Sequence, residues 1–263
     1  MNPSGKSIWI TGASSGIGEA LARKFSALGC CLVLSGRNTE KLQALCKELG
    51  HEKTRMLAFD LADTVISREE IVKNAWSCFG GIDILINNGG VSQRLTATET
   101  SEDMLRSLME TNFLSHAEIG RLVAIRMMEQ GGGKIVVISS IAGKFGFYFR
   151  SGYSAAKHAL HGYFESLRLE CESRGITVLM VCPGKIKTSV SLNALGKSGE
   201  PHGIMDASHA VAMEPNVCAD KIIEAIKSNR EEVFIGGKEL LMPKFRQWFP
   251  PLFRFLLRRV RKD

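Results

Sequence analysis

The chain has 263 residues, of which 44% are hydrophobic and 23% charged, a balance that excludes a disordered or fibrous protein and fits one large α/β domain. Its formal net charge is +7, but residues 244–263 carry seven basic side chains against one acidic one, so +6 belongs to this tail. The remaining chain is nearly neutral, which excludes a basic body for nucleic-acid binding.

Short apolar runs alternate with longer amphipathic ones along the whole sequence. The apolar runs predict strands at Ser7–Thr11, Cys31–Leu34, Met56–Phe59, Ile82–Ile86, Lys134–Ser139, Thr177–Val181 and Glu232–Ile235. The amphipathic runs predict helices near Ile17–Leu28, Thr39–Leu49, Arg68–Cys78, Glu102–Glu129, Tyr153–Ser173 and Asn216–Ser228. This alternation predicts an α/β fold: a single-domain, Rossmann-type, doubly wound parallel sheet of about seven strands with helices on both faces.

Residues 238–263 break this rhythm and form a basic, amphipathic C-terminal tail after a domain that spans residues 1–237. Apolar residues recur there at helical intervals, and Pro250–Pro251 predicts two short helices instead of one. Three uses of the tail stay open: contact with an anionic membrane surface, packing against a partner subunit, or cover for the chain's own cleft.

The cysteines and the N-terminus indicate a compartment. Seven cysteines are scattered with no CxxC pair, so we expect neither disulfides nor a metal site. The start MNPSGKSIWITG does not fit a signal peptide, and no run of 18 apolar residues occurs. We therefore predict a cytoplasmic protein, with peripheral membrane contact through the tail as an option.

A glycine-rich loop joins the first predicted strand to the first helix. Its pattern is GxxxGxG at residues 12–18. Glycines permit a tight turn and let backbone N–H groups approach a pyrophosphate at the positive end of the helix. A plain strand-to-helix turn is the alternative. The loop residues expected to bind a nucleotide cofactor are Gly12, Ser14, Ser15, Gly16, Ile17 and Gly18.

The end of the second predicted strand indicates which nucleotide is bound. An acidic residue near this point typically binds the ribose 2′-hydroxyl of NAD, but Arg37-Asn38 stands here instead. A guanidinium pairs well with a 2′-phosphate, so we predict NADP(H) over NAD(H). A solvated arginine is the alternative. Asp60-Leu61, placed at the end of the third strand, is expected to flank the adenine, although a carboxylate there also caps turns.

Tyr153 and Lys157 lie four residues apart on a predicted helix and therefore share one face. The ordinary pKa of tyrosine is about 10, and a nearby cation lowers it. Reduction of a ketone needs a hydride on carbon and a proton on oxygen, and such a tyrosine supplies the proton. Alone, a Tyr–Lys pair is usually surface chemistry, so its weight depends on the other motifs.

Six motifs occur together in order and spacing over residues 6–190. They are TGxxxGxG at 11–18, Asn87-Asn88-Gly89-Gly90, Asn112, Ser139-Ser140, Tyr153 with Lys157, and Pro-Gly-Lys-Ile-Lys-Thr at 183–188. This combination resembles the short-chain dehydrogenase/reductase family. The stretches FDLAD (59–63), METN (109–112), ISSIAGK (138–144), FRSGYSAAKHA (149–159) and GIMD (203–206) resemble its branch of dehydrogenase/reductase family member 7B-like proteins.

The resemblance implies a role for each catalytic candidate. Ser140 would donate a hydrogen bond to the substrate oxygen, and Tyr153 would be the general acid or base. Lys157 would hold the nicotinamide ribose and lower the pKa of Tyr153, while Asn112 would position Lys157 through water. Further cofactor contacts are implied for Asn87, Gly89, Pro183, Gly184, Ile186 and Thr188.

Some nearby residues are given lesser roles. Ser139 is the weaker serine candidate because its spacing to Tyr153 is one residue too long for the family. His158 and His161 are expected to be structural. Gly89 departs from the family's usual Asn-Asn-Ala-Gly, a loss of one methyl that leaves the fold intact but loosens the turn.

The resemblance also frames the substrate side. Residues 189–214 stand where the family has its substrate-covering loop, and their scattered Leu, Ile and Met predict an apolar or lipid-like small-molecule carbonyl or alcohol. Homodimers or homotetramers through the long helices are implied by the family. The Tyr-to-Lys spacing disfavours the alternative that the chain is an enoyl reductase. The presence of Ser140, Tyr153 and Lys157 disfavours the alternative that it is a non-catalytic NADP-binding scaffold.

Overall fold

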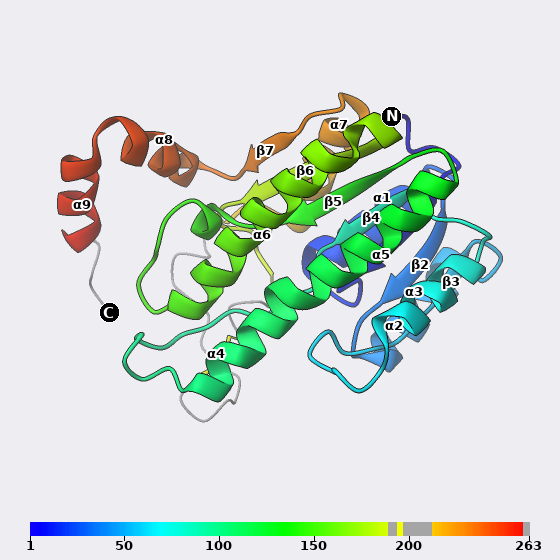
Figure 1. Cartoon of the computed structure of the whole chain (residues 1–263), viewed down its shortest axis with the longest axis horizontal. Coiled ribbons are helices and arrows are strands. Elements are labelled where there is room, and N and C mark those ends of the chain that lie inside the picture. Colours follow the sequence, from blue (N-terminus) through cyan, green and yellow to red (C-terminus); the bar gives the residue numbers. More distant parts are fainter. Residues whose placement is uncertain (189–193, 197–211, 260–263) are drawn as a thin grey trace.

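The computed structural model describes residues 1–188, 194–196 and 212–259 and is built around one parallel sheet (Figure 1). The sheet has seven strands in the order β3-β2-β1-β4-β5-β6-β7. The strands are β1 (Ser7–Thr11), β2 (Cys31–Ser35), β3 (Thr54–Met56), β4 (Ile84–Asn87), β5 (Gly133–Ile138), β6 (Ile176–Pro183) and β7 (Glu232–Ile235). The predicted Rossmann-type fold is thereby confirmed.

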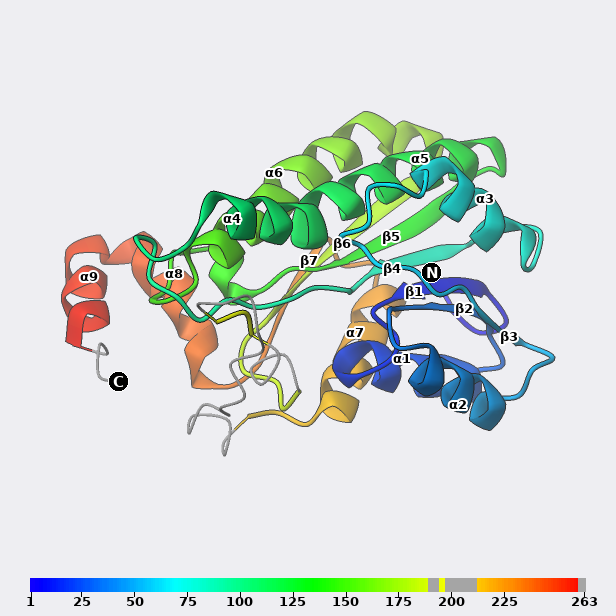
Figure 2. The same cartoon turned by 90° about the horizontal axis from the view of Figure 1, so that it is seen from below.

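Helices cover both faces of the sheet, so the molecule has three layers (Figure 2). On one face lie α1 (Gly16–Ala27), α2 (Thr39–Leu49) and α7 (Pro215–Lys227). On the other lie α3 (Arg68–Ser77), α5 (Ser115–Glu129) and α6 (Ser151–Cys171), with α4 (Glu102–Met109) preceding α5. Apolar residues from both faces of β1, β2, β4, β5 and β6 fill two separate cores, which explains why these central strands are largely apolar.

The strand order reverses direction at β1, which pairs with both β2 and β4. In such a sheet, the loops that leave neighbouring strands diverge at this point and open a crevice at the carboxyl ends. The glycine loop follows β1 and the Asn87-Asn88-Gly89-Gly90 run follows β4, so the fold places both at this crevice.

Two predicted elements differ from the structure. The third strand is Thr54–Met56, not Met56–Phe59, because the following apolar residues leave the sheet edge and Phe59 packs on Trp9 instead, with ring centroids 6.3 Å apart. Asp60 therefore lies in a loop, not at a strand end. The single helix predicted over 102–129 is divided by the π-helical segment η1 (Glu110–Leu114), which periodicity alone does not reveal.

The C-terminal tail forms the two short helices that Pro250–Pro251 predicts, α8 (Leu241–Trp248) and α9 (Pro250–Arg259), after a 3₁₀ turn. They lie beside the body at the edge of the molecule (Figure 1). No helix in the described ranges is both long and apolar enough to cross a membrane. Most of the predicted substrate-covering loop, residues 189–214, falls outside the described residues.

Candidate active site

The glycine loop fits closely against the end of β4. Gly12 has a φ of 65°, and a Cβ there would lie 2.6 Å from the Gly89 Cα. A Cβ on Gly18 would lie 2.3 Å from the Gly12 carbonyl oxygen. The Asn88 side-chain amide donates to the carbonyls of Thr11 and Gly12 at 3.0 and 3.1 Å. No larger residue fits at either glycine, and the amide holds the ends of β1 and β4 together.

The N-terminus of α1 has no side-chain cap. Ser15 occupies the N-cap position without a capping hydrogen bond, whereas the Asn38 side chain caps α2 by accepting from the Lys41 N–H at 2.8 Å. The first N–H groups of a helix need an external partner, and a phosphate is a natural one. Thr188 lies beside this end, because a Cβ on Gly16 would be 2.9 Å from its Cγ2. The residues present thus fit a phosphate-bearing cofactor.

The other residues that we expected to bind the nucleotide differ in whether their side chains are free to do so. Arg37 Nη1 lies 3.7 Å from Asp60 Oδ2, with the arginine side chain 63% exposed. Ser14 lies next to the end of β2, since a Cβ on Gly36 would be 3.2 Å from its Oγ. The Asn38 side chain is occupied as the α2 cap, and Ile17 packs on the core. Arg37 and Asp60 therefore bring an exposed guanidinium and a partly exposed carboxylate together at this edge, with Ser14 beside the end of β2.

Leu61 explains why glycine replaces the family's usual alanine at position 89. A Cβ on Gly89 would lie 2.4 Å from the Leu61 Cδ1, and Leu61 is 8% exposed. The leucine methyl group fills the space that the family's alanine methyl would take. The turn is consequently packed, and the loosening that we expected there is not what the structure shows.

Ser140, Tyr153 and Lys157 converge at the carboxyl end of β5. Burial raises the pKa of the Tyr153 phenol, while the charge of Arg150 and a hydrogen bond with the Ser140 side chain lower it. Ser140 begins a 3₁₀ turn, where its Oγ accepts from the Ala142 N–H at 3.1 Å. Ser140 is thus close enough to Tyr153 to influence its pKa, so the two hydroxyl groups lie in one site.

Lys157 lies deeper than Tyr153. Its Nζ is 5.7 Å from the centre of the Tyr153 ring and donates to the Ile138 carbonyl at 2.8 Å. Burial lowers the pKa of Lys157 to about 8. The groups that lower the pKa of Tyr153 in this arrangement are Arg150 and Ser140, whereas we expected Lys157.

Asn112 projects from the π-helical segment towards the same region. It is fully buried, its Oδ1 accepts from the Val91 N–H at 3.0 Å, and its Nδ2 donates to the Leu108 carbonyl at 3.0 Å. A Cβ on Gly90 would lie 2.6 Å from the Asn112 Oδ1 and 3.8 Å from the Lys157 Nζ. Gly90 therefore separates Asn112 from Lys157, and only a residue without a side chain fits between them.

The segment after β6 is held by the tail. Gly184 leaves no room for a side chain, since a Cβ there would be 2.3 Å from Glu239 Oε1, and the same oxygen accepts from the Lys185 N–H at 2.9 Å. Pro183 ends β6, and Ile186 is 6% exposed in the core. The Ile186 side chain thus serves packing, which leaves its backbone as the group available to a cofactor.

Two residues that the sequence analysis did not single out support the site. His116 Nε2 lies 2.7 Å from the Gly89 carbonyl and must donate to it, and burial lowers the pKa of His116 to about 3. The Asn87 amide donates to the His116 carbonyl at 3.1 Å. Gln93 Oε1 accepts from the N–H groups of Gly152 and Tyr153 at 2.8 and 3.3 Å, which fixes the start of α6. Gln93 lies 60 residues before Tyr153, so no local pattern signals this contact.

A polar cluster lies behind Lys157. Ser139 Oγ donates to the Lys157 carbonyl at 3.2 Å and lies 3.1 Å from His161 Nε2. His161, Cys182 and Glu232 form a group with metal-ligand atoms close together, but the Lys144 ammonium already pairs with Glu232 at 2.6 Å. These contacts agree with the structural role expected for His161. They also leave Ser140, not Ser139, beside Tyr153.

Comparisons with known proteins agree with this geometry. A family model described as short chain dehydrogenase matches residues 6–197. Dehydrogenase/reductase SDR family member 7B of Danio rerio is 36% identical over 98% of this chain and 86% of that relative. A Drosophila melanogaster relative, dehydrogenase/reductase SDR family protein 7-like, is 34% identical over 96% of this chain and 79% of its own length.

Solved structures share the fold. A short-chain dehydrogenase/reductase from Burkholderia phymatum in complex with NAD has a TM-score of 0.85 at 23% identity, with 96% of each chain covered. A short-chain dehydrogenase from Sphingobium yanoikuyae in complex with NADPH has a TM-score of 0.75 at 27% identity, with 87% of each chain covered. The two neighbours therefore carry different nicotinamide nucleotides on one architecture.

Proposed function

Because the chain belongs to the short-chain dehydrogenase/reductase family, we propose that it is an NADP(H)-dependent oxidoreductase that interconverts a ketone or aldehyde and an alcohol. One observation carries this proposal: Tyr153 lies at the carboxyl end of β5 with Ser140 and the buried Lys157 ammonium, whose Nζ is 5.7 Å from the centre of the Tyr153 ring. This set stands at the crevice that the uncapped end of α1 also faces, so a proton donor lies within the same site as a phosphate cradle.

The reaction divides between cofactor and protein. The bound nicotinamide supplies or takes up the hydride. In reduction, the Tyr153 hydroxyl gives its proton to the carbonyl oxygen, and Ser140 donates a hydrogen bond to that oxygen; in oxidation, Tyr153 takes the proton back. Lys157 binds the ribose hydroxyls, and Asn112 positions Lys157. The charge of Arg150 and the Ser140 hydroxyl lower the pKa of Tyr153 against the effect of burial.

The preference for NADP(H) rests on Arg37. Its exposed guanidinium follows β2, and its neighbour Asp60 is 3.7 Å away at a half-exposed position. A 2′-phosphate would pair with the guanidinium in place of this weak, solvent-screened contact. Ser14, beside the end of β2, supplies a hydroxyl on the same edge.

The substrate that we propose is apolar. The segment between Ser140 and Tyr153 carries Phe147, Tyr148 and Phe149, and Leu95 is bridged to Arg150 next to this segment. Aromatic and aliphatic walls favour an apolar carbonyl compound over a small polar sugar. Faster turnover of small polar ketones than of medium-chain or aromatic ketones would contradict this substrate class.

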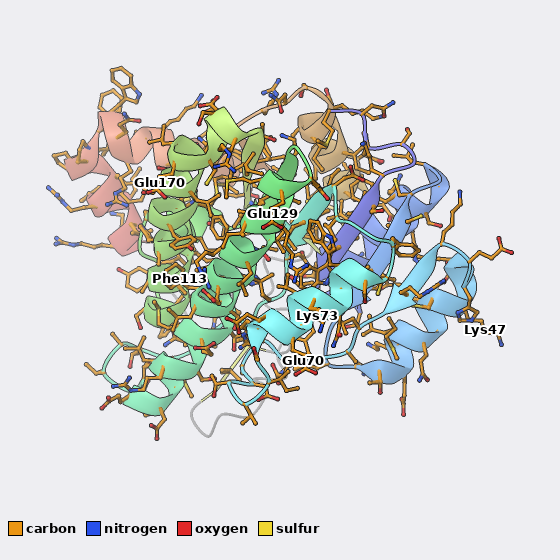
Figure 3. The ribbon with its side chains drawn as sticks, turned by 45° about the vertical axis from the view of Figure 1, so that its right-hand side comes forward. Lys47, Glu70, Lys73, Phe113, Glu129 and Glu170 are labelled. Carbon is orange, nitrogen blue, oxygen red and sulfur yellow. The ribbon has the colours of Figure 1, made fainter. Side chains whose placement is uncertain are left out.

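Oligomers and location complete the proposal. Exposed apolar side chains on the α4–α6 layer, Leu105, Leu114, Ile125 and Leu169, support a homodimer or homotetramer through these helices. Phe113 and Glu170 lie on the outward side of the same layer (Figure 3). All seven cysteines are free thiols, which supports a reducing compartment such as the cytoplasm.

The test is a paired titration of the purified protein with NADPH and NADH, followed by quenching of tryptophan fluorescence. We expect NADPH to bind at least roughly tenfold more tightly, and we expect Arg37→Ala to remove most of this difference. Arg23→Ala, which removes an arginine from α1 outside the proposed site, is the matched control. If the protein bound neither nucleotide, the proposal that it is an oxidoreductase would be wrong. If it preferred NADH, the proposed role of Arg37 would be wrong.

A further inference from the structure

The tail helices expose their largest apolar side chains. Trp248, Phe249, Leu252, Phe255 and Leu256 are 74, 57, 47, 49 and 44% exposed, and we call these five residues the tail face. Leu252, Phe255 and Leu256 follow helical spacing and lie on one side of α9. Soluble monomers rarely expose so many large apolar groups within one short segment unless it contacts a partner.

The opposite side of α9 holds the helix on the body. Phe253 is 6% exposed and packs on Phe145 with ring centroids 5.4 Å apart. Leu257 lines an open groove of about 610 Å³ together with Phe147 and Tyr148. Arg246 donates to the Lys144 carbonyl. The tail is therefore docked through other residues, and the tail face is not spent on covering the chain's own cleft.

The charge around the tail face has one sign. Residues 240–259 contain Lys244, Arg246, Arg254, Arg258 and Arg259 and no acidic residue. Within the described chain, Lys244, Arg254, Arg258 and Arg259 have no carboxylate partner in a salt bridge. Arg259 instead lies over the Phe255 ring at 4.3 Å, which places a cation directly at the apolar surface.

We propose that the tail face docks on the surface of an anionic lipid bilayer. The five apolar side chains enter the boundary between headgroups and acyl chains, and the basic residues beside them contact anionic headgroups. A second copy of this chain would bring a second set of unpaired cations to the same contact, so charge complementarity favours the lipid surface. This inference goes beyond the proposed oxidoreductase activity, because it assigns a surface and a partner that the reaction itself does not need.

The test uses the full chain and vesicles of phosphatidylcholine with or without phosphatidylserine. We expect at least roughly tenfold stronger co-sedimentation with the anionic vesicles, weakened by high salt. Trp248 emission should shift to the blue on binding, and Trp248→Phe should remove that shift, since Trp9 is fully buried and Trp76 lies on α3 in contact with Arg126. Equal binding to both vesicles, or no binding, would overturn the proposal.

Variants test whether vesicle binding depends on the tail face or on any exposed apolar side chain. The double change Phe255→Ser with Leu256→Ser should reduce vesicle binding roughly tenfold or more. Val217→Ser is the matched control, because this residue lies on α7, outside the tail and the α4–α6 layer, is 46% exposed and should leave vesicle binding unchanged. A loss of self-association in the double variant without any vesicle binding by the wild type would assign the face to a second copy instead. NADPH binding, measured on the same samples, keeps failure of this proposal distinct from failure of the oxidoreductase.

Discussion

The catalytic centre and the tail use the same types of side chain in opposite ways. In the body, large residues are enclosed: Phe145 and Phe164 are 1 and 0% exposed, and Asn112 has a partner for both its oxygen and its nitrogen. In the tail, Phe249 and Phe255 are about half exposed, and Arg254, Arg258 and Arg259 have no carboxylate partner among the described residues. Burial explains the body, whereas the exposed residues of the tail gain nothing from folding and point to a contact with something else.

The largest expected effect belongs to the catalytic centre. Tyr153→Phe removes the phenol oxygen and keeps the ring, so kcat should fall by about 10² to 10⁴, the range for loss of a general acid. The affinity for NADPH and the melting temperature should change little. Steady-state kinetics with an apolar ketone measures the loss, and nucleotide titration provides the control. Activity close to that of the wild type would assign the proton to another group.

A second prediction concerns pH and the buried core of the site. His116 has a pKa of about 3 in the folded protein against 6.5 ordinarily, so between these values the unfolded state binds more protons. The contribution of His116 to the free energy of unfolding should therefore be present in full above pH 6.5. As the pH is lowered below 6.5, the free energy of unfolding should fall by up to about 1.4 kcal/mol per pH unit.

Urea unfolding at several pH values between neutral and roughly pH 5 measures this slope. His116→Gln keeps an amide donor for the Gly89 carbonyl but cannot titrate, so its stability should depend less on pH. His158→Gln, at an exposed position, should keep the slope of the wild type. An identical pH dependence in wild type and His116→Gln would contradict the prediction.

The smallest expected effect concerns the tail, where substitutions on the docked and the exposed sides of α9 should differ in their effect on hydrogen exchange. Phe253→Ala removes the ring that packs on Phe145 and should raise amide exchange of α9 roughly tenfold by undocking the helix. Phe255→Ala, on the exposed side, should change exchange less than roughly twofold. Hydrogen exchange of residues 250–259 measures both. Equal loss of protection would mean that the two sides of α9 are not distinct.

The sequence predicts most of the scaffold because its local signals and the fold agree. Glycine spacing locates the turn after β1, and continuous apolar runs locate strands that are buried on both faces. Prediction fails where long-range packing decides. Phe59 leaves the sheet edge for Trp9, which lies 50 residues earlier in the chain. This outcome is not visible from propensity or periodicity.

The candidate site follows the same division. Tyr153, Lys157 and Ser140 are found from their spacing, and the structure brings them together. The supporting contacts of Gln93 and His116 join residues 60 and 27 positions apart, so they depend on tertiary structure. The packed turn at Gly89 likewise depends on Leu61, which a sequence without the fold cannot relate to it.

The π-helical segment η1 is a place where this helical layer tolerates a change of length. Its wide turn holds one residue more than a turn of the α-helices on either side, and Asn112 lies within it. Deleting one residue between Glu110 and Leu114 would let a continuous α-helix form, with α4 and α5 still facing the directions they face now. The same deletion in the middle of α5 would rotate one part of that helix by about 100° relative to the other. The loss of a single codon in η1 would therefore spare the packing of both helices and change only the placement of Asn112.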